Sequence, residues 1–311
     1  MKITKHMVLP VLLSAIFALS LVSPAYGYNL QNKFIPSDAT WLIHLDFKVL
    51  LKTKIWDEIF QGEKKKIFNS RERKFFKKGK DELVKELNFD ILNDLNSVSI
   101  YGKSKGGGNA VVILSGKFDR QKIIRKLNSI KHLDKSKYGN LDVYSWDNDN
   151  FGSFINGDLL IITHSKKNLE SALDIIKGKS TNFIGTDLFK RLKEIPHNSI
   201  LFALTENLSS LVGKHLKAPV IINKSRMAFF LALEKNSGIK LLLKLYTESR
   251  EAAKNIMQIG NGLLALARFN ENELKEELEL FNSIKISVNG KIVKADLLIP
   301  SGFILKNIHK Y

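Results

Sequence analysis

His44 and Asp46 are the residues whose types and spacing come nearest to a reactive site. They are two apart in an alternating apolar run over residues 39–47, so they project from the same face of a strand. A histidine beside a carboxylate can be a base with its orienting partner, or half of a metal site. Alternatively, Asp46 caps the amides of a following helix and His44 is a half-buried polar residue. Because no nucleophile can be tied to them, we keep His44 and Asp46 as a polar pair and name no catalytic residue.

A basic segment, Lys64–Lys80, is the most unusual stretch of the chain. It holds nine basic residues and one acidic residue, with phenylalanines at 68, 75 and 76 between the charges. This pattern indicates a basic amphipathic helix that meets an anionic surface. Two alternatives stay open: a solvated helix whose phenylalanines pack on the sheet, and internal pairing with the glutamate-rich stretch Glu271–Glu279. The candidate anion-binding residues are Lys64, Lys65, Lys66, Arg71, Arg73, Lys74, Lys77 and Lys78.

The chain shows no convincing metal or cofactor motif. It has no cysteine, which excludes thiolate metal sites and disulfides. The segment from Asp147 to Asp158 resembles a calcium loop, but Phe151 stands where an oxygen ligand is needed. We therefore expect a polar turn there, and neither a metal nor a cofactor in the protein.

The first 27 residues have the layout of a secretory signal peptide. Lys2 and Lys5 precede a sixteen-residue apolar run that ends at Val22, and small residues follow. The run is shorter than the roughly 20 residues of a spanning helix. We expect cleavage after Gly27, or else after Ala25, and export to the periplasm or the exterior. The alternative is a membrane anchor formed by an uncleaved segment.

The charge points to anionic partners. The formal net charge is +18, and only eight of the 49 basic residues are arginine. Lysine suits diffuse attraction better than bidentate recognition. In the envelope, the partners would be anionic lipid, lipopolysaccharide, acidic polysaccharide or an envelope protein. The predicted location makes nucleic acid an unlikely partner, and no transmembrane segment is expected after the signal peptide.

Hydrophobic periodicity predicts the same order of elements twice. In the first half, strands are expected at 39–47, 97–102, 110–117, 141–146, 152–155 and 159–163, with helices after residues 47, 119 and 165. In the second half, strands are expected at 200–204, 227–233, 239–246, 284–288 and 292–299, with helices at 207–216 and 248–268 and after 301. Asn156-Gly157 predicts a type I′ hairpin turn.

These elements predict an α+β protein with two tandem related modules. Because tight turns can join only antiparallel strands, each module is expected to hold an antiparallel sheet with helices packed on one face. The boundary falls in the small, polar segment Lys177–Asn182. The predicted organisation is a signal peptide over residues 1–27, a first module over 28–180 and a second over 181–311.

Short stretches of the chain resemble a group of uncharacterised exported bacterial proteins. The resemblance rests on Ile35–Ala39, His44-Leu45-Asp46, Gly116–Asp119 and Tyr144-Ser145-Trp146. It implies export and an α+β body, and it implies no activity.

Together these features predict an exported, non-enzymatic envelope protein that binds an anionic surface or a protein partner through a basic face. The alternative is a secreted hydrolase without a recognisable motif.

Overall fold

A computed structural model describes residues 34–60, 84–103, 110–130, 132–147, 149–206, 225–236, 238–269, 280 and 282–307. Four predicted features lie outside these residues. They are the signal peptide, the basic segment Lys64–Lys80, the helix at 207–216 and the acidic stretch Glu271–Glu279.

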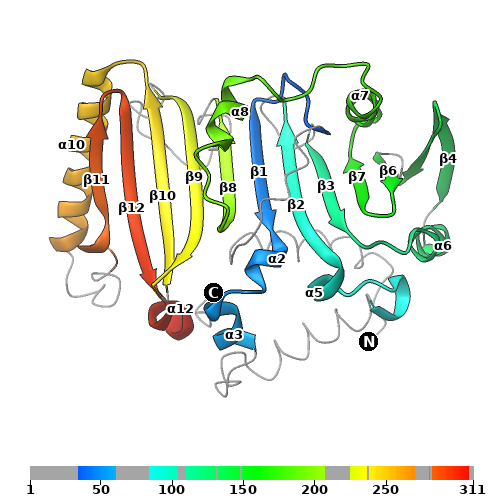
Figure 1. Cartoon of the computed structure of the whole chain (residues 1–311), viewed down its shortest axis with the longest axis horizontal. Coiled ribbons are helices and arrows are strands. Elements are labelled where there is room, and N and C mark those ends of the chain that lie inside the picture. The colour runs from blue at the N-terminus through cyan, green and yellow to red at the C-terminus, as the bar shows by residue number, and fades with distance from the viewer. Residues whose placement is uncertain are drawn as a thin grey trace.

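The described strands form one antiparallel sheet of twelve strands (Figure 1). They are β1 (Trp41–Asp46), β2 (Leu95–Gly102), β3 (Val111–Gly116), β4 (Leu133–Tyr138), β5 (Leu141–Trp146), β6 (Asn150–Asn156), β7 (Leu159–Thr163), β8 (Ser199–Thr205), β9 (Ser225–Lys235), β10 (Gly238–Thr247), β11 (Lys285–Asn289) and β12 (Ile292–Pro300). The helices considered below are α2 (Phe47–Leu50), α3 (Lys54–Phe60), α5 (Ile91–Asp94), α6 (Arg120–Ile130), α7 (Lys166–Ile176), α8 (Asp187–Leu192), α10 (Arg250–Phe269) and α12 (Ser301–Asn307). The predicted α+β class with antiparallel strands is confirmed.

The two halves of the chain meet at the centre of the sheet. The strand order is β11-β12-β10-β9-β8-β1-β2-β3-β7-β6-β5-β4, and β1 pairs antiparallel with β8, placing Leu42 opposite Leu204. Counted outward from this pair, strands β1, β2, β3, β7 and β6 occupy the same positions in the sheet as β8, β9, β10, β12 and β11 on the other side. One core cluster holds side chains of both halves, including Tyr101 and Phe229. The duplication and the boundary at residue 180 remain predictions within this shared sheet.

Local signals explain where the helices begin. The Asp46 carboxylate accepts a hydrogen bond from the amide of Val49 at 3.1 Å and caps α2. Asp119 accepts from the amide of Lys122 at 3.0 Å before α6, as its position in the sequence predicts. Such caps satisfy amides that have no partner within the helix.

The helices cover both faces of the sheet. On β7, Ile161 packs in the core cluster that contains Leu169 and Leu173 of α7. The neighbouring residue Ile162 packs on the other face, with Ile123 of α6. Because β1 and β8 are buried nearly throughout, their strands need cover on both sides. Helices therefore pack on both faces of the sheet, whereas the sequence predicts helices on one face only.

The hairpin between β6 and β7 differs from the predicted type I′ turn. Asn156 pairs with Leu159, so the turn residues are Gly157 and Asp158. Neither Asn156 nor Gly157 has a positive φ. The strand register shifts between Phe154 and Asn156, so β6 ends in a β-bulge and the predicted type I′ turn does not form.

Candidate functional site

The predicted polar pair lies in the protein interior. His44 is 1% exposed and Asp46 is 0% exposed. The Nδ1 atom of His44 is 2.8 Å from the Ser99 Oγ, and the imidazole lies 5.0 Å from the ring centroid of Phe202. Burial lowers the pKa of His44 to about 3, so the ring is neutral at neutral pH. With Asp46 capping α2, the geometry supports the structural interpretation of both residues.

A different site lies on the opposite face of the sheet, beneath α6. It is an apolar cavity of about 110 Å³ between the helix and strands β3, β5, β6 and β7. From the helix it is lined by Ile123, Ile124 and Leu127, which recur at helical spacing and are partly exposed. From the sheet it is lined by three aromatic side chains, those of Tyr144, Trp146 and Phe154, and by aliphatic ones on β3 and β7.

Phe118 closes one side of the cavity. Its ring stacks on Phe89, with centroids 5.3 Å apart, and lies edge-on to Phe154 at 6.5 Å. Phe118 directly precedes Asp119, the residue that caps α6. The start of α6 and the aromatic wall are therefore fixed by neighbouring residues in the chain.

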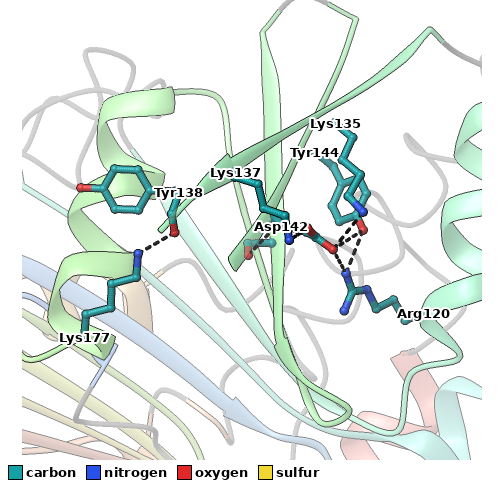
Figure 2. Close-up of polar contacts among 8 residues, drawn as sticks. Arg120, Lys135, Lys137, Tyr138, Asp142, Tyr144 and Lys177 are labelled. Atoms are coloured by element: carbon teal, nitrogen blue, oxygen red, sulfur yellow. Dashed lines mark hydrogen bonds and ion pairs between the residues drawn. The ribbon is translucent and has the colours of Figure 1, made fainter. Parts of the chain in front are cut away.

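A cationic cluster stands beside this cavity, around Asp142 (Figure 2). The Asp142 carboxylate is ion-paired with Arg120, with Lys135 at 3.1 Å and with Lys137 at 2.7 Å. Arg120 also donates to the Tyr144 hydroxyl at 2.9 Å. Three cations share one carboxylate, so the cluster carries a net positive charge.

Contacts within the cluster stabilise the charged forms of Asp142 and Arg120. The hydrogen bond from Lys137, with further contributions from Lys135, holds the pKa of Asp142 well below its usual range. The hydrogen bond to Tyr144 raises the pKa of Arg120. Arg120 also lies 5.9 Å from the ring centroids of Tyr144 and Phe154, both of which line the cavity. A fixed cation therefore stands at the edge of an apolar pocket.

A second exposed feature lies on α10, beside the edge strand β11 (Figure 1). The buried face of the helix, with Ala253 and Ile256, packs against strands β10 to β12. Three large apolar side chains at spacings of four and three residues remain in solvent. Ile259, Leu263 and Leu266 are 39%, 56% and 65% exposed. A stripe of this kind on a helix is a candidate interaction surface.

The structure leaves the predicted anion-binding lysines and arginines untested, because Lys64–Lys80 lies outside the described residues. It also assembles a cluster that the sequence does not predict. Lys135 and Lys137 alternate on β4, and Asp142 and Tyr144 alternate on β5, so each pair shares one face of its strand. That alternation is a usable signal, and the two-residue turn Gly139-Asn140, which joins β4 to β5 as a hairpin, is a second one.

The described residues contain no group of three or more His, Cys, Asp or Glu side chains arranged for a metal ion. Among the same residues, no helix is long and apolar enough to cross a membrane.

Comparisons with known proteins show the fold alone. No family model and no curated protein sequence matches the chain. Crystal form I of TP0453 superposes with a TM-score of 0.52 at 11% identity, covering 90% of this chain and 97% of that one. Crystal form IV of TP0453 gives a TM-score of 0.50 at 10% identity, covering 89% and 95%. The fold therefore occurs in another protein, and the similarity covers most of both chains.

Proposed function

We propose that this protein is an exported, non-enzymatic envelope protein that binds an anionic lipid surface. The observation that carries the proposal is the exposed apolar stripe Ile259, Leu263 and Leu266 on α10, in a chain with a formal net charge of +18. An amphipathic helix with exposed leucines can bury them at the boundary between headgroups and acyl chains, while basic residues attract the anionic surface.

Several features favour this function over its alternatives. An acidic polysaccharide offers charge but no apolar layer in which Leu263 and Leu266 could be buried. A hydrolase would need its reactive groups to be reachable, and His44 and Asp46 are enclosed. The signal peptide layout of residues 1–27 supports an envelope location, either periplasmic or extracellular. Lipopolysaccharide and a protein partner remain as outcomes of the experiment.

The test is co-sedimentation of the mature chain, residues 28–311, with vesicles of phosphatidylcholine alone or mixed with phosphatidylglycerol. Binding is expected only with phosphatidylglycerol, and it should weaken between about 0.1 M and about 1 M salt, where the Debye length falls from about 10 to about 3 Å. Leu263→Ser combined with Leu266→Ser should reduce binding by about tenfold or more, because two leucines lose their apolar burial. Ile184→Ser is the matched control, since Ile184 is an equally exposed apolar residue elsewhere, at 54%.

The contribution of the basic segment can be separated from net charge. Replacing Lys64, Lys65, Lys66, Lys77 and Lys78 with glutamine should weaken vesicle binding. Replacing Lys166, Lys167, Lys179, Lys193 and Lys235 changes the net charge equally and should weaken it less. Equal binding to both vesicle types, unaffected by salt and by the leucine changes, would refute the proposal. Binding to lipopolysaccharide or to an envelope protein in place of phosphatidylglycerol vesicles would replace the proposed partner.

A further inference from the structure

The apolar cavity beneath α6 has the properties of a ligand site. Its lining residues come from α6, from strands β3, β5, β6 and β7 and from the neighbouring residues Leu87, Phe89 and Phe118, and its exposed lining is apolar. Cavities lined only by apolar groups stay dry, and one of about 150 Å³ binds benzene. The volume here, about 110 Å³, is enough for a few carbon atoms. The cavity therefore fits the end of an alkyl chain better than a ring system or a polar ligand.

Trp146 contributes the apolar surface of its indole ring to the cavity wall and is 5% exposed. The exposed lining of the cavity is apolar, so it offers van der Waals contacts to an alkyl chain.

The neighbouring cationic cluster favours a ligand whose alkyl chain carries an anionic head group. Arg120 contacts the Tyr144 hydroxyl at 2.9 Å and lies over the rings of Tyr144 and Phe154, which are part of the cavity wall. Lys135 stands 6.0 Å from the Tyr144 ring centroid. Among the described residues, Asp142 alone is ion-paired with Arg120, Lys135 and Lys137, so this rim attracts anions.

We propose that the cavity beneath α6 binds a single-chain anionic amphiphile. Its alkyl end occupies the pocket formed by Ile124, Leu127 and Phe154. Its anionic head lies against Arg120 and Lys135, whose side chains Figure 2 shows beside Asp142. Fatty acids and monoacyl phospholipids share this chemistry. The inference does not depend on the surface proposed for α10, because the two sites lie on different helices and different strands.

The experiment uses the mature chain and titrates dodecanoate, monoacyl phosphatidylglycerol and dodecanol by calorimetry below their aggregation concentrations. Both anionic amphiphiles, or one of them, should bind with one molecule per protein, and dodecanol should bind more weakly. The anionic probe that binds more tightly identifies the ligand class as a fatty acid or as a monoacyl phospholipid. Failure of both to bind, or binding only once they aggregate, would overturn the proposal.

Two variants test where the alkyl chain and the anionic head of the ligand bind. Ile124→Phe fills the pocket and should lower affinity for the anionic probe by about tenfold, the effect of losing burial of about two methylene groups. Arg120→Gln should lower affinity for the anionic probe by about tenfold but leave dodecanol binding unchanged. Lys122→Gln, on the same helix but outside the Asp142 cluster, should change neither. Should Ile124→Phe fail to fold, Arg120→Gln with its control still decides the outcome.

Fluorescence locates the chain independently. Dodecanoate with a bromine at its terminal carbon should quench one of the three tryptophans, because Trp146 lines the cavity and Trp41 and Trp56 do not. Trp146→Phe should abolish the quenching while calorimetric binding persists. Quenching that survives in this variant would place the chain elsewhere and refute the proposed site.

Discussion

The imidazole of His44 and the hydroxyl of Ser99 form a hydrogen-bonded pair in the middle of the sheet. Their Nδ1 and Oγ atoms are 2.8 Å apart, and the residues face each other across strands β1 and β2. His44 is 1% and Ser99 3% exposed. A pair this deeply enclosed cannot reach a substrate, but it makes the stability of the fold depend on pH.

We expect the free energy of unfolding to decrease as the pH is lowered from 6.5. Unfolded histidine takes up a proton near pH 6.5, whereas folded His44 does so only at about 3, because burial disfavours the charged ring. The unfolded state therefore binds more protons between these values, so acid favours it by up to about 1.4 kcal/mol per pH unit. His44→Gln should reduce the slope in urea unfolding curves measured from pH 7.5 to 5. Ser99→Ala keeps the titrating ring, so it should lower stability at every pH and retain the slope. An unchanged slope in His44→Gln would contradict this account.

Asp142→Asn should make the rim of the cavity more cationic. It removes the one carboxylate that pairs with Arg120, Lys135 and Lys137 within the part of the chain that the structure describes. We expect tighter binding of dodecanoate and a loss of about 1 kcal/mol in unfolding free energy at pH 7, the upper end of what solvent-exposed ion pairs contribute. Since the pKa of Asp142 is lowered in the folded state, this loss should shrink as the pH falls below the usual carboxyl range. Calorimetry and urea unfolding measure the two effects. Asp134→Asn makes the same change of net charge on β4 and should produce neither.

Glu194 should stabilise the second half of the sheet only while it is ionised. Burial alone would raise its pKa, but hydrogen bonds from Lys244, Arg191 and Tyr246 outweigh burial and lower the pKa from 4.5 to about 2. Its contribution is present above pH 4.5 and is lost as the pH falls towards 2. Glu194→Gln should therefore cost about 1 kcal/mol at pH 7 and progressively less in acid, as measured by chemical unfolding. Asp187→Asn, which removes an exposed pair with Lys190, should have a smaller effect.

Gly102 gives a steric test of the packing on β2. A Cβ atom at this position would lie 2.5 Å from Cζ2 of Trp41, a rigid ring that is 9% exposed. Gly102→Ala should therefore destabilise the protein by about 1–3 kcal/mol and shift tryptophan emission as the ring moves. Gly262→Ala is the opposite case, because it lies in α10 with open space around it. That change should stabilise by up to about 1 kcal/mol. Equal effects of the two substitutions would show that the ring does not constrain Gly102.

The exported protein should begin at Tyr28. Lys2 and Lys5, the apolar run to Val22 and the small residues Ala25 and Gly27 predict removal of residues 1–27. Intact mass of the secreted or periplasmic protein distinguishes this end from cleavage after Ala25. A mass that includes residues 1–27 would support the membrane-anchored alternative.

Local signals determined most of the secondary structure. The alternation over residues 41–46 gave β1, and the helical spacing of Ile256, Leu263 and neighbouring residues gave α10. Asp119 and Ser165 marked helix starts because a side-chain cap and the amide that it satisfies are only three residues apart. The helix predicted after residue 47 is divided into α2 and α3, and β4 and α8 were not predicted. β4 carries four exposed residues in a row, so it lacks the apolar alternation that identifies a strand.

The sequence by itself determined the α+β class, the antiparallel hairpins and the polar character of the His44–Asp46 pair, because these depend on residues close together in the chain. Only the tertiary structure decided that β1 lies beside β8, that the pair is enclosed, and that Arg120 reaches Asp142 and Tyr144 beside an apolar cavity. Those features join segments separated by up to about 160 residues. Their positions follow from which apolar faces pack together, and that choice is made by the whole core.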